Sequence, residues 1–78
     1  MPVTIQQRDM EAVFKVTDDL GIHREAITVP LGKRDPGGVK DLGGGQLQVT
    51  LPESVDAEEW SETTLREELG VLGYEPLP

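Results

Sequence analysis

The sequence lacks cysteine altogether, so neither a disulfide nor a thiolate-bound zinc ion can stabilise its 78 residues. A chain of this size buries only about 60% of the surface that its unfolded form exposes. We therefore expect a single domain over residues 1–78, of modest stability. Association into a homodimer, through an edge or a face of a sheet, would add to that stability.

Histidine is nearly absent as well, because His23 is the only one. A zinc site built from several histidines is thereby excluded. A Ser-His-Asp relay would need His23 to meet Ser54 or Ser61, the only serines, and nothing in the spacing brings them together. A carboxylate site for Mg²⁺ or Ca²⁺ stays open, although no Asp-x-Asp-x-Asp-Gly loop is present. We expect a protein that is not an enzyme and has no cofactor.

Aromatic residues and long apolar runs are also scarce. One Trp, one Tyr and one Phe offer few platforms for stacking nucleic-acid bases. No run approaches the roughly 20 apolar residues of a membrane span, and no charged and then apolar leader opens the sequence. We expect a cytoplasmic protein. The lack of Asn and Cys beside many acids is typical of a thermophilic or salt-loving source.

Positive charge is scarce, since 7 Lys and Arg face 15 Asp and Glu and leave a net charge of -8. Such a chain repels nucleic acids and anionic membranes on average. Residues 32–45, GKRDPGGVKDLGGG, are the exception, because Lys33, Arg34 and Lys40 there outnumber two aspartates. We expect this stretch to be a flexible, glycine-rich hairpin loop. Its basic tip would contact a phosphate or an acidic protein surface; the alternative is a solvated loop with no partner.

The clearest elements that are present lie in the second half of the chain. Leu47, Val49 and Leu51 alternate with polar residues, which predicts a strand with one buried face. A helix then begins near Asp56, whose side chain can accept from free backbone N–H groups, and it ends at residues 69–70.

A second helix is predicted over residues 6–20. Apolar residues recur there at helical spacing, and Gly21 follows as a left-handed C-terminal residue. An alternating pattern in residues 10–16 would favour a strand instead, but the glycine ending favours the helix.

Three short strands complete the prediction, over residues 3–5, 26–31 and 71–77. The resulting order is the split βαβ, ferredoxin-like βαββαβ fold of the α+β class, an antiparallel sheet with two helices on one face. In this fold we expect the two helices to be antiparallel. The predicted core consists of Val13, Phe14, Val16, Leu20, Trp60, Leu65, Leu69 and Leu72.

The last third, VTLPESVDAEEWSETTLREELGVLGYEP, resembles the closing strand, helix and GYE segment of heavy-metal-associated domains. The resemblance implies the ferredoxin-like fold. Those domains bind metal on a Cys-x-x-Cys loop before their first helix, and residues 6–10 of this chain contain no thiol. Metal transport is therefore not implied.

The stretch QLQVTLPESVD also resembles the start of ribbon-helix-helix DNA-binding proteins. The resemblance implies that Gln46, Gln48 and Thr50 read the major groove. That family needs a second helix directly afterwards, whereas residues 70–78 hold two glycines and two prolines.

The placement of acids suggests a function. Each predicted helix ends in a carboxylate pair, Asp18-Asp19 and Glu67-Glu68, where the helix dipole disfavours negative charge. In the antiparallel arrangement the pairs would lie at opposite ends of one layer. We expect a non-enzymatic interaction or regulatory module that binds a basic protein partner through these four acids. The alternatives are an antitoxin-like, nucleic-acid-linked regulator that uses the basic loop or residues 46–50, and a small-molecule-sensing domain. A salt-adapted proteome rich in carboxylates explains the acids equally well.

Overall fold

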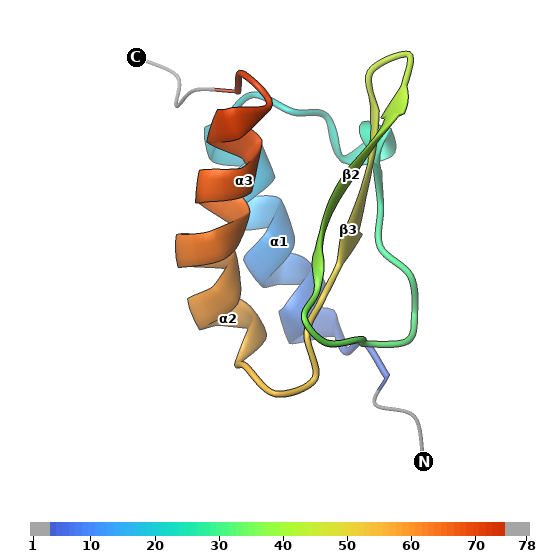
Figure 1. Cartoon of the computed structure of the whole chain (residues 1–78), viewed down its shortest axis with the longest axis vertical. Coiled ribbons are helices and arrows are strands. Elements are labelled where there is room, and N and C mark those ends of the chain that lie inside the picture. The colour runs from blue at the N-terminus through green and yellow to red at the C-terminus, as the bar shows by residue number, and fades with distance from the viewer. Residues whose placement is uncertain (1–3, 75–78) are drawn as a thin grey trace.

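The computed structural model describes residues 4–74, which form an α+β fold of two helices and a three-stranded mixed sheet (Figure 1). Helix α1 (Gln7–Asp19) leads through a 3₁₀ turn (Arg24–Ala26) into strand β1 (Ile27–Thr28), and β2 (Gly38–Gly43) and β3 (Gln46–Thr50) follow. The second helix consists of α2 (Ala57–Trp60), a π-helical segment (Ser61–Leu65) and α3 (Arg66–Val71). None of the helices within residues 4–74 has the length and hydrophobicity that crossing a bilayer requires.

The two predicted helices are confirmed, and local signals explain where they begin. The Asp9 carboxylate accepts from the Gln6 N–H at 2.9 Å, which satisfies one free donor at the start of α1. The Asp56 carboxylate accepts from the Glu59 N–H at the start of α2. Gly21 follows α1 with a φ of 73°, as its C-terminal role requires.

The sheet differs from the prediction, and the full ferredoxin-like order with an antiparallel sheet is not confirmed. The strand order is β1-β3-β2, in which β1 is parallel to β3 and β2 is antiparallel to it. The fold implied by the resemblance to heavy-metal-associated domains is therefore supported only at the level of an α+β protein.

The predicted outer strands are shorter than expected or replaced. Of residues 3–5, Thr4 makes one isolated bridge to Gly32, and residue 3 lies outside the described residues. Strand 26–31 is reduced to β1, since Pro30 cannot donate to a ladder. Val71 belongs to α3, a turn follows it, and residues 75–77 lie outside the described residues.

The glycine-rich stretch 32–45 is not one long loop, because its second half forms β2. Three consecutive glycines carry the tight turn from β2 to β3, with φ values of 84° at Gly43, 61° at Gly44 and 80° at Gly45. Gly44 and Gly45 form the two-residue turn itself, between the paired residues Gly43 and Gln46. Two-residue hairpin turns need positive φ, which glycine adopts without a Cβ penalty. The glycines that suggested flexibility therefore build a hairpin.

The two helices run parallel to one another, so the predicted antiparallel arrangement is wrong (Figure 1). Lys15 pairs with Glu62, and four residues further along both helices Asp19 pairs with Arg66. The cause is the sheet: α1 leads into β1 and β3 leads into the second helix, so each helix reverses the direction of its neighbouring strand. Because β1 and β3 are parallel, the helices are parallel too.

The core lies between the helices and the inner face of the sheet. Val13, Val16, Leu20, Trp60, Leu65 and Leu69 are buried as predicted, together with Leu47, Val49 and Leu51 of the β3 segment. Phe14 packs against this core only in part. The prediction that Leu72 belongs to the core is wrong, because this residue follows the end of α3 and is 42% exposed.

Candidate functional site

The outer face of the sheet is polar and bears positive charge. Because Leu47, Val49 and Leu51 point into the core, the alternate residues Gln48 and Thr50 point outward. Lys40 of β2 pairs with Gln48 in the register, so both side chains lie on this outer face. The strand face and the basic stretch, predicted as two separate binding surfaces, therefore meet in one place.

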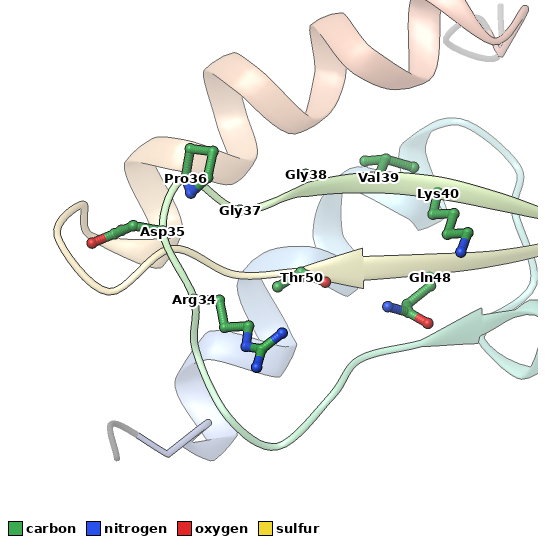
Figure 2. Close-up of a pocket in the computed structure, with 9 residues that line it drawn as sticks. All are labelled: Arg34, Asp35, Pro36, Gly37, Gly38, Val39, Lys40, Gln48 and Thr50. Atoms are coloured by element: carbon green, nitrogen blue, oxygen red, sulfur yellow. The ribbon is translucent and has the colours of Figure 1, made fainter. Parts of the chain in front are cut away.

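A shallow groove of about 300 Å³ lies on this face (Figure 2). We call it the sheet-face groove. It is lined by Arg34, Asp35, Pro36, Gly37, Gly38, Val39, Lys40, Gln48 and Thr50. Figure 2 shows Arg34, Lys40, Gln48 and Thr50 on the same side of the sheet, with α1 behind it. The chain between β1 and β2 supplies Arg34, and the two strands supply the other three.

The segment that carries Arg34 is fixed at three consecutive residues. The Lys33 ammonium lies 3.1 Å from the Asp9 carboxylate in an ion pair that is nearly buried on both sides. The Arg34 N–H donates to the Leu51 carbonyl at 2.8 Å. Two of the three residues, Lys33 and Arg34, are thereby held against the rest of the fold.

Asp35 provides the third anchor. One oxygen of its carboxylate accepts from the Glu53 N–H at 2.9 Å, and from the N–H and hydroxyl of Ser54 at 3.1 and 3.0 Å. The bonds from Ser54, and then that from Glu53, lower the pKa of the Asp35 carboxyl. The carboxylate is therefore engaged by the turn after β3 and does not pair with the neighbouring Arg34.

Replacing Asp35 with alanine should loosen this anchor without unfolding the protein. The Glu53 and Ser54 amides lose their acceptor, so their hydrogen exchange should accelerate selectively. Since the pKa of Asp35 is lowered in the folded state, the contribution of this carboxylate is present near neutral pH and is lost as the pH falls through the lowered pKa. Exchange measured by NMR checks this; equal rates in Asp35→Ala and wild type would contradict it.

Arg8, Arg34 and Lys40 make no ion pair with any of the described residues, and of these three only Arg34 and Lys40 line the sheet-face groove. Four of the seven cations, Lys15, Arg24, Lys33 and Arg66, do pair with carboxylates. In a chain with twice as many acids as bases, these two unpaired cations give the groove, which Asp35 also lines, a local excess of positive charge.

Lys33, predicted to bind a partner with Arg34 and Lys40, forms an ion pair with Asp9. Its side chain is only 14% exposed and is engaged by Asp9. Burial acts to raise the pKa of the Asp9 carboxyl, but the Gln6 N–H and the Lys33 ammonium outweigh it and hold the pKa below its usual value. The sequence pattern of three nearby cations could not show that one of them faces inward.

The four acids predicted to bind a basic partner lie at the same end of the helical layer. Asp19 pairs with Arg66 at 2.7 Å, and Asp18 pairs with Arg24 at 2.8 Å. Glu67 and Glu68 are exposed and make no ion pair within residues 4–74. Half of the predicted acidic surface is therefore engaged by cations of the same chain.

The residues of a Ser-His-Asp relay do not lie together in the structure. His23 is exposed beyond the end of α1, Ser61 is buried in the second helix, and the Ser54 hydroxyl is held by Asp35. In the part of the chain that the structure describes, no three His, Asp or Glu residues are grouped so that they could hold a metal ion.

The sheet-face groove itself was not predicted, because it depends on pairing between distant segments. The groove is lined in part by Gly37 and Gly38, and the pairing of β2 with β3 places Lys40 opposite Gln48. The sequence signals for it were the polar alternation in residues 46–50 and the cluster of cations in residues 32–45.

Comparison of the chain with protein-family models, with curated proteins and with solved structures gives no match.

Proposed function

We propose that this protein is a small, non-enzymatic interaction module that binds a partner protein on the outer face of its sheet. The sheet-face groove would receive an anionic group of the partner. The observation that carries the proposal is that Arg34 and Lys40 share the groove and pair with no carboxylate among the described residues.

The composition of the groove supports binding more than chemistry. Arg34, Lys40, Gln48 and Thr50 all carry hydrogen-bond donors, and no histidine, cysteine or serine is among the residues that line it. The groove is at the lower limit of the volumes found for small-molecule sites, which run from about 300 to 1,000 Å³. A shallow surface suits one group of a larger partner better than a whole small ligand.

A photo-cross-linking experiment tests where the partner binds. Thr28 is exposed and pairs with Gln48 on the outer face, so a photo-reactive residue in its place leaves the groove intact. The matched position is Glu58, which is exposed on the helical layer. We expect a discrete cross-linked protein from position 28 in the cells that make this chain, and its loss when Arg34→Gln and Lys40→Gln are added. A product from position 58 alone would contradict the proposal.

The acidic helical surface is the second candidate, in agreement with the basic partner expected from the sequence. The two helices, Gln7–Asp19 and residues 57–71, hold nine acids against three bases. This excess would attract a basic protein at low ionic strength. The same cross-linking experiment decides between the two surfaces, because position 58 reports on this one.

Nucleic-acid binding is the weaker alternative. Two unpaired cations on a chain of net charge -8 would neutralise too few phosphates for tight binding.

We also propose that the protein forms a homodimer by pairing of β2 with β2 of a second copy. Strand β2 is an edge strand in the order β1-β3-β2.

A further inference from the structure

We infer that the anionic group bound in the sheet-face groove is a phosphate monoester on an otherwise basic segment of the partner protein. This inference rests on the proposed function and names the chemistry of its ligand. Three features of the described residues support it: the donor set, the fixed position of one cation, and the acidic surroundings.

The donor set matches a phosphate better than a carboxylate. A phosphate monoester carries about -1.5 to -2 charges at neutral pH and three terminal oxygens, whereas a carboxylate carries one charge and two oxygens. Arg34 and Lys40 together supply two positive charges, and Gln48 and Thr50 add neutral donors. The Asp35 carboxylate also lines the groove, but it accepts hydrogen bonds from Glu53 and Ser54. A carboxylate would leave one cation and part of this donor set unused.

The position of Arg34 is prepared before a ligand arrives. Its flanking residues Lys33 and Asp35 are held by Asp9 and by the turn at residues 53–54. Its own N–H is bonded to Leu51. Less backbone freedom is therefore lost when the Arg34 guanidinium binds phosphate oxygens, which favours affinity. Guanidinium groups bind phosphate through two parallel hydrogen bonds.

The surroundings of the groove determine what the rest of the ligand must be. The groove is a small positive area on a molecule of net charge -8. A nucleic acid or a polyacidic peptide would place further negative charges beside this acidic body, which repels them. A single phosphate flanked by lysine or arginine places one compact dianion on the cations, and its basic neighbours are attracted by the net negative charge of the molecule.

The test uses the full chain and defined probes, followed by ¹⁵N NMR. The probes are O-phosphoserine and three short synthetic peptides that differ at one position, with phosphoserine, serine or glutamate flanked by lysines. We expect the phosphoserine peptide to shift the amides of Gly37, Gly38, Lys40, Gln48 and Thr50. It should bind at least about tenfold more tightly than the serine peptide, as expected for charge-assisted hydrogen bonds.

Three single-charge variants provide the matched comparison. Arg34→Gln and Lys40→Gln should each weaken binding of the phosphoserine peptide by about tenfold. Arg8→Gln is the control, because Arg8 also makes no ion pair within residues 4–74 but does not line the groove. It should change the affinity by no more than about twofold through long-range charge alone.

Each other result overturns the inference in a distinguishable way. Equal binding of the glutamate peptide would assign a carboxylate ligand and leave the proposed function standing. Equal binding of the serine peptide would assign the acidic helical surface. Tighter binding of a DNA or RNA oligonucleotide would assign a nucleic acid. If no probe shifts the groove amides but position 28 still cross-links a partner, only the phosphate is lost; if both fail, the proposed function is lost with it.

Discussion

Replacing Asp9 with alanine is expected to lower the free energy of unfolding by about 3 kcal/mol, as for other broken buried ion pairs. The Asp9 carboxylate is almost fully buried, lies 3.1 Å from the Lys33 ammonium and accepts the Gln6 N–H. Its removal leaves a nearly buried cation without a counter-charge and a helix N-terminus without its acceptor. For a domain of this size, the loss corresponds to a fall of about 12 °C or more in melting temperature.

The pH dependence of this contribution follows from the lowered pKa of Asp9. A carboxyl whose pKa is lower in the folded than in the unfolded state stabilises the fold above the unfolded pKa, and this stability is lost as the pH falls through the folded pKa. The difference between wild type and Asp9→Ala should therefore be full at neutral pH and should shrink in acid. Urea denaturation followed by the fluorescence of the buried Trp60, the only tryptophan, measures it.

Asp18→Ala is the matched control, since it removes an ion pair that is exposed on both sides. Its effect on stability should be much smaller, because water and salt screen exposed pairs. Equal losses from Asp9→Ala and Asp18→Ala would show that burial of the Asp9–Lys33 pair has no energetic weight. Loss of the Asp9–Lys33 pair should also loosen the segment that carries Arg34. The affinity of the sheet-face groove for the phosphoserine peptide should therefore fall in Asp9→Ala protein that remains folded.

Replacing Gly37 with alanine is expected to cost about 2 kcal/mol or more, because its φ of 75° alone disfavours a side chain by roughly 1–2 kcal/mol. An added Cβ would also lie 2.8 Å from the Thr50 carbonyl oxygen and 3.0 Å from two atoms of Pro52. Both neighbours belong to the end of the central strand and the residues after it, which cannot move freely. The start of β2 would therefore be pushed away from β3, where Gly38 pairs with Thr50.

Gly32→Ala is the matched control, because a Cβ there meets no atom within 4 Å and the φ of this glycine is not positive. Its stability should equal that of the wild type or exceed it slightly, as an alanine restricts the unfolded chain. Urea denaturation compares the two variants, and NMR shifts of Lys40 and Gln48 report on the groove. A wild-type stability and spectrum for Gly37→Ala would show that this close approach does not constrain the sheet.

These two predictions concern the same feature, the segment between β1 and β2. Asp9 fixes its Lys33 end, and Gly37 allows its other end to pass close to the residues after β3. Arg34 lies between these points. The stability of the fold and the geometry of the sheet-face groove are therefore coupled, and variants at either end should affect both.

Several elements could be predicted from the sequence because their signals are local. Apolar spacing and Gly21 predict the helix at residues 6–20, and alternation predicts the strand at 46–51. The predicted end of the second helix at residues 69–70 is wrong, because α3 continues through Gly70 to Val71. Leu72 comes directly after the helix and is exposed. The glycines at 37–45 suggested a loop, since a sequence does not show which glycines accompany a paired strand.

The sequence by itself determined the α+β class, the two helices, the central strand and most of the core, because periodicity and capping act between residues close along the chain. Only the tertiary structure decided the mixed sheet, the parallel helices and the different environments of Lys33, Arg34 and Lys40. Those features depend on pairing between distant segments: β1 with β3, Lys33 with Asp9, and Asp35 with Ser54. Such pairs form through space and leave no periodic trace in the order of residues.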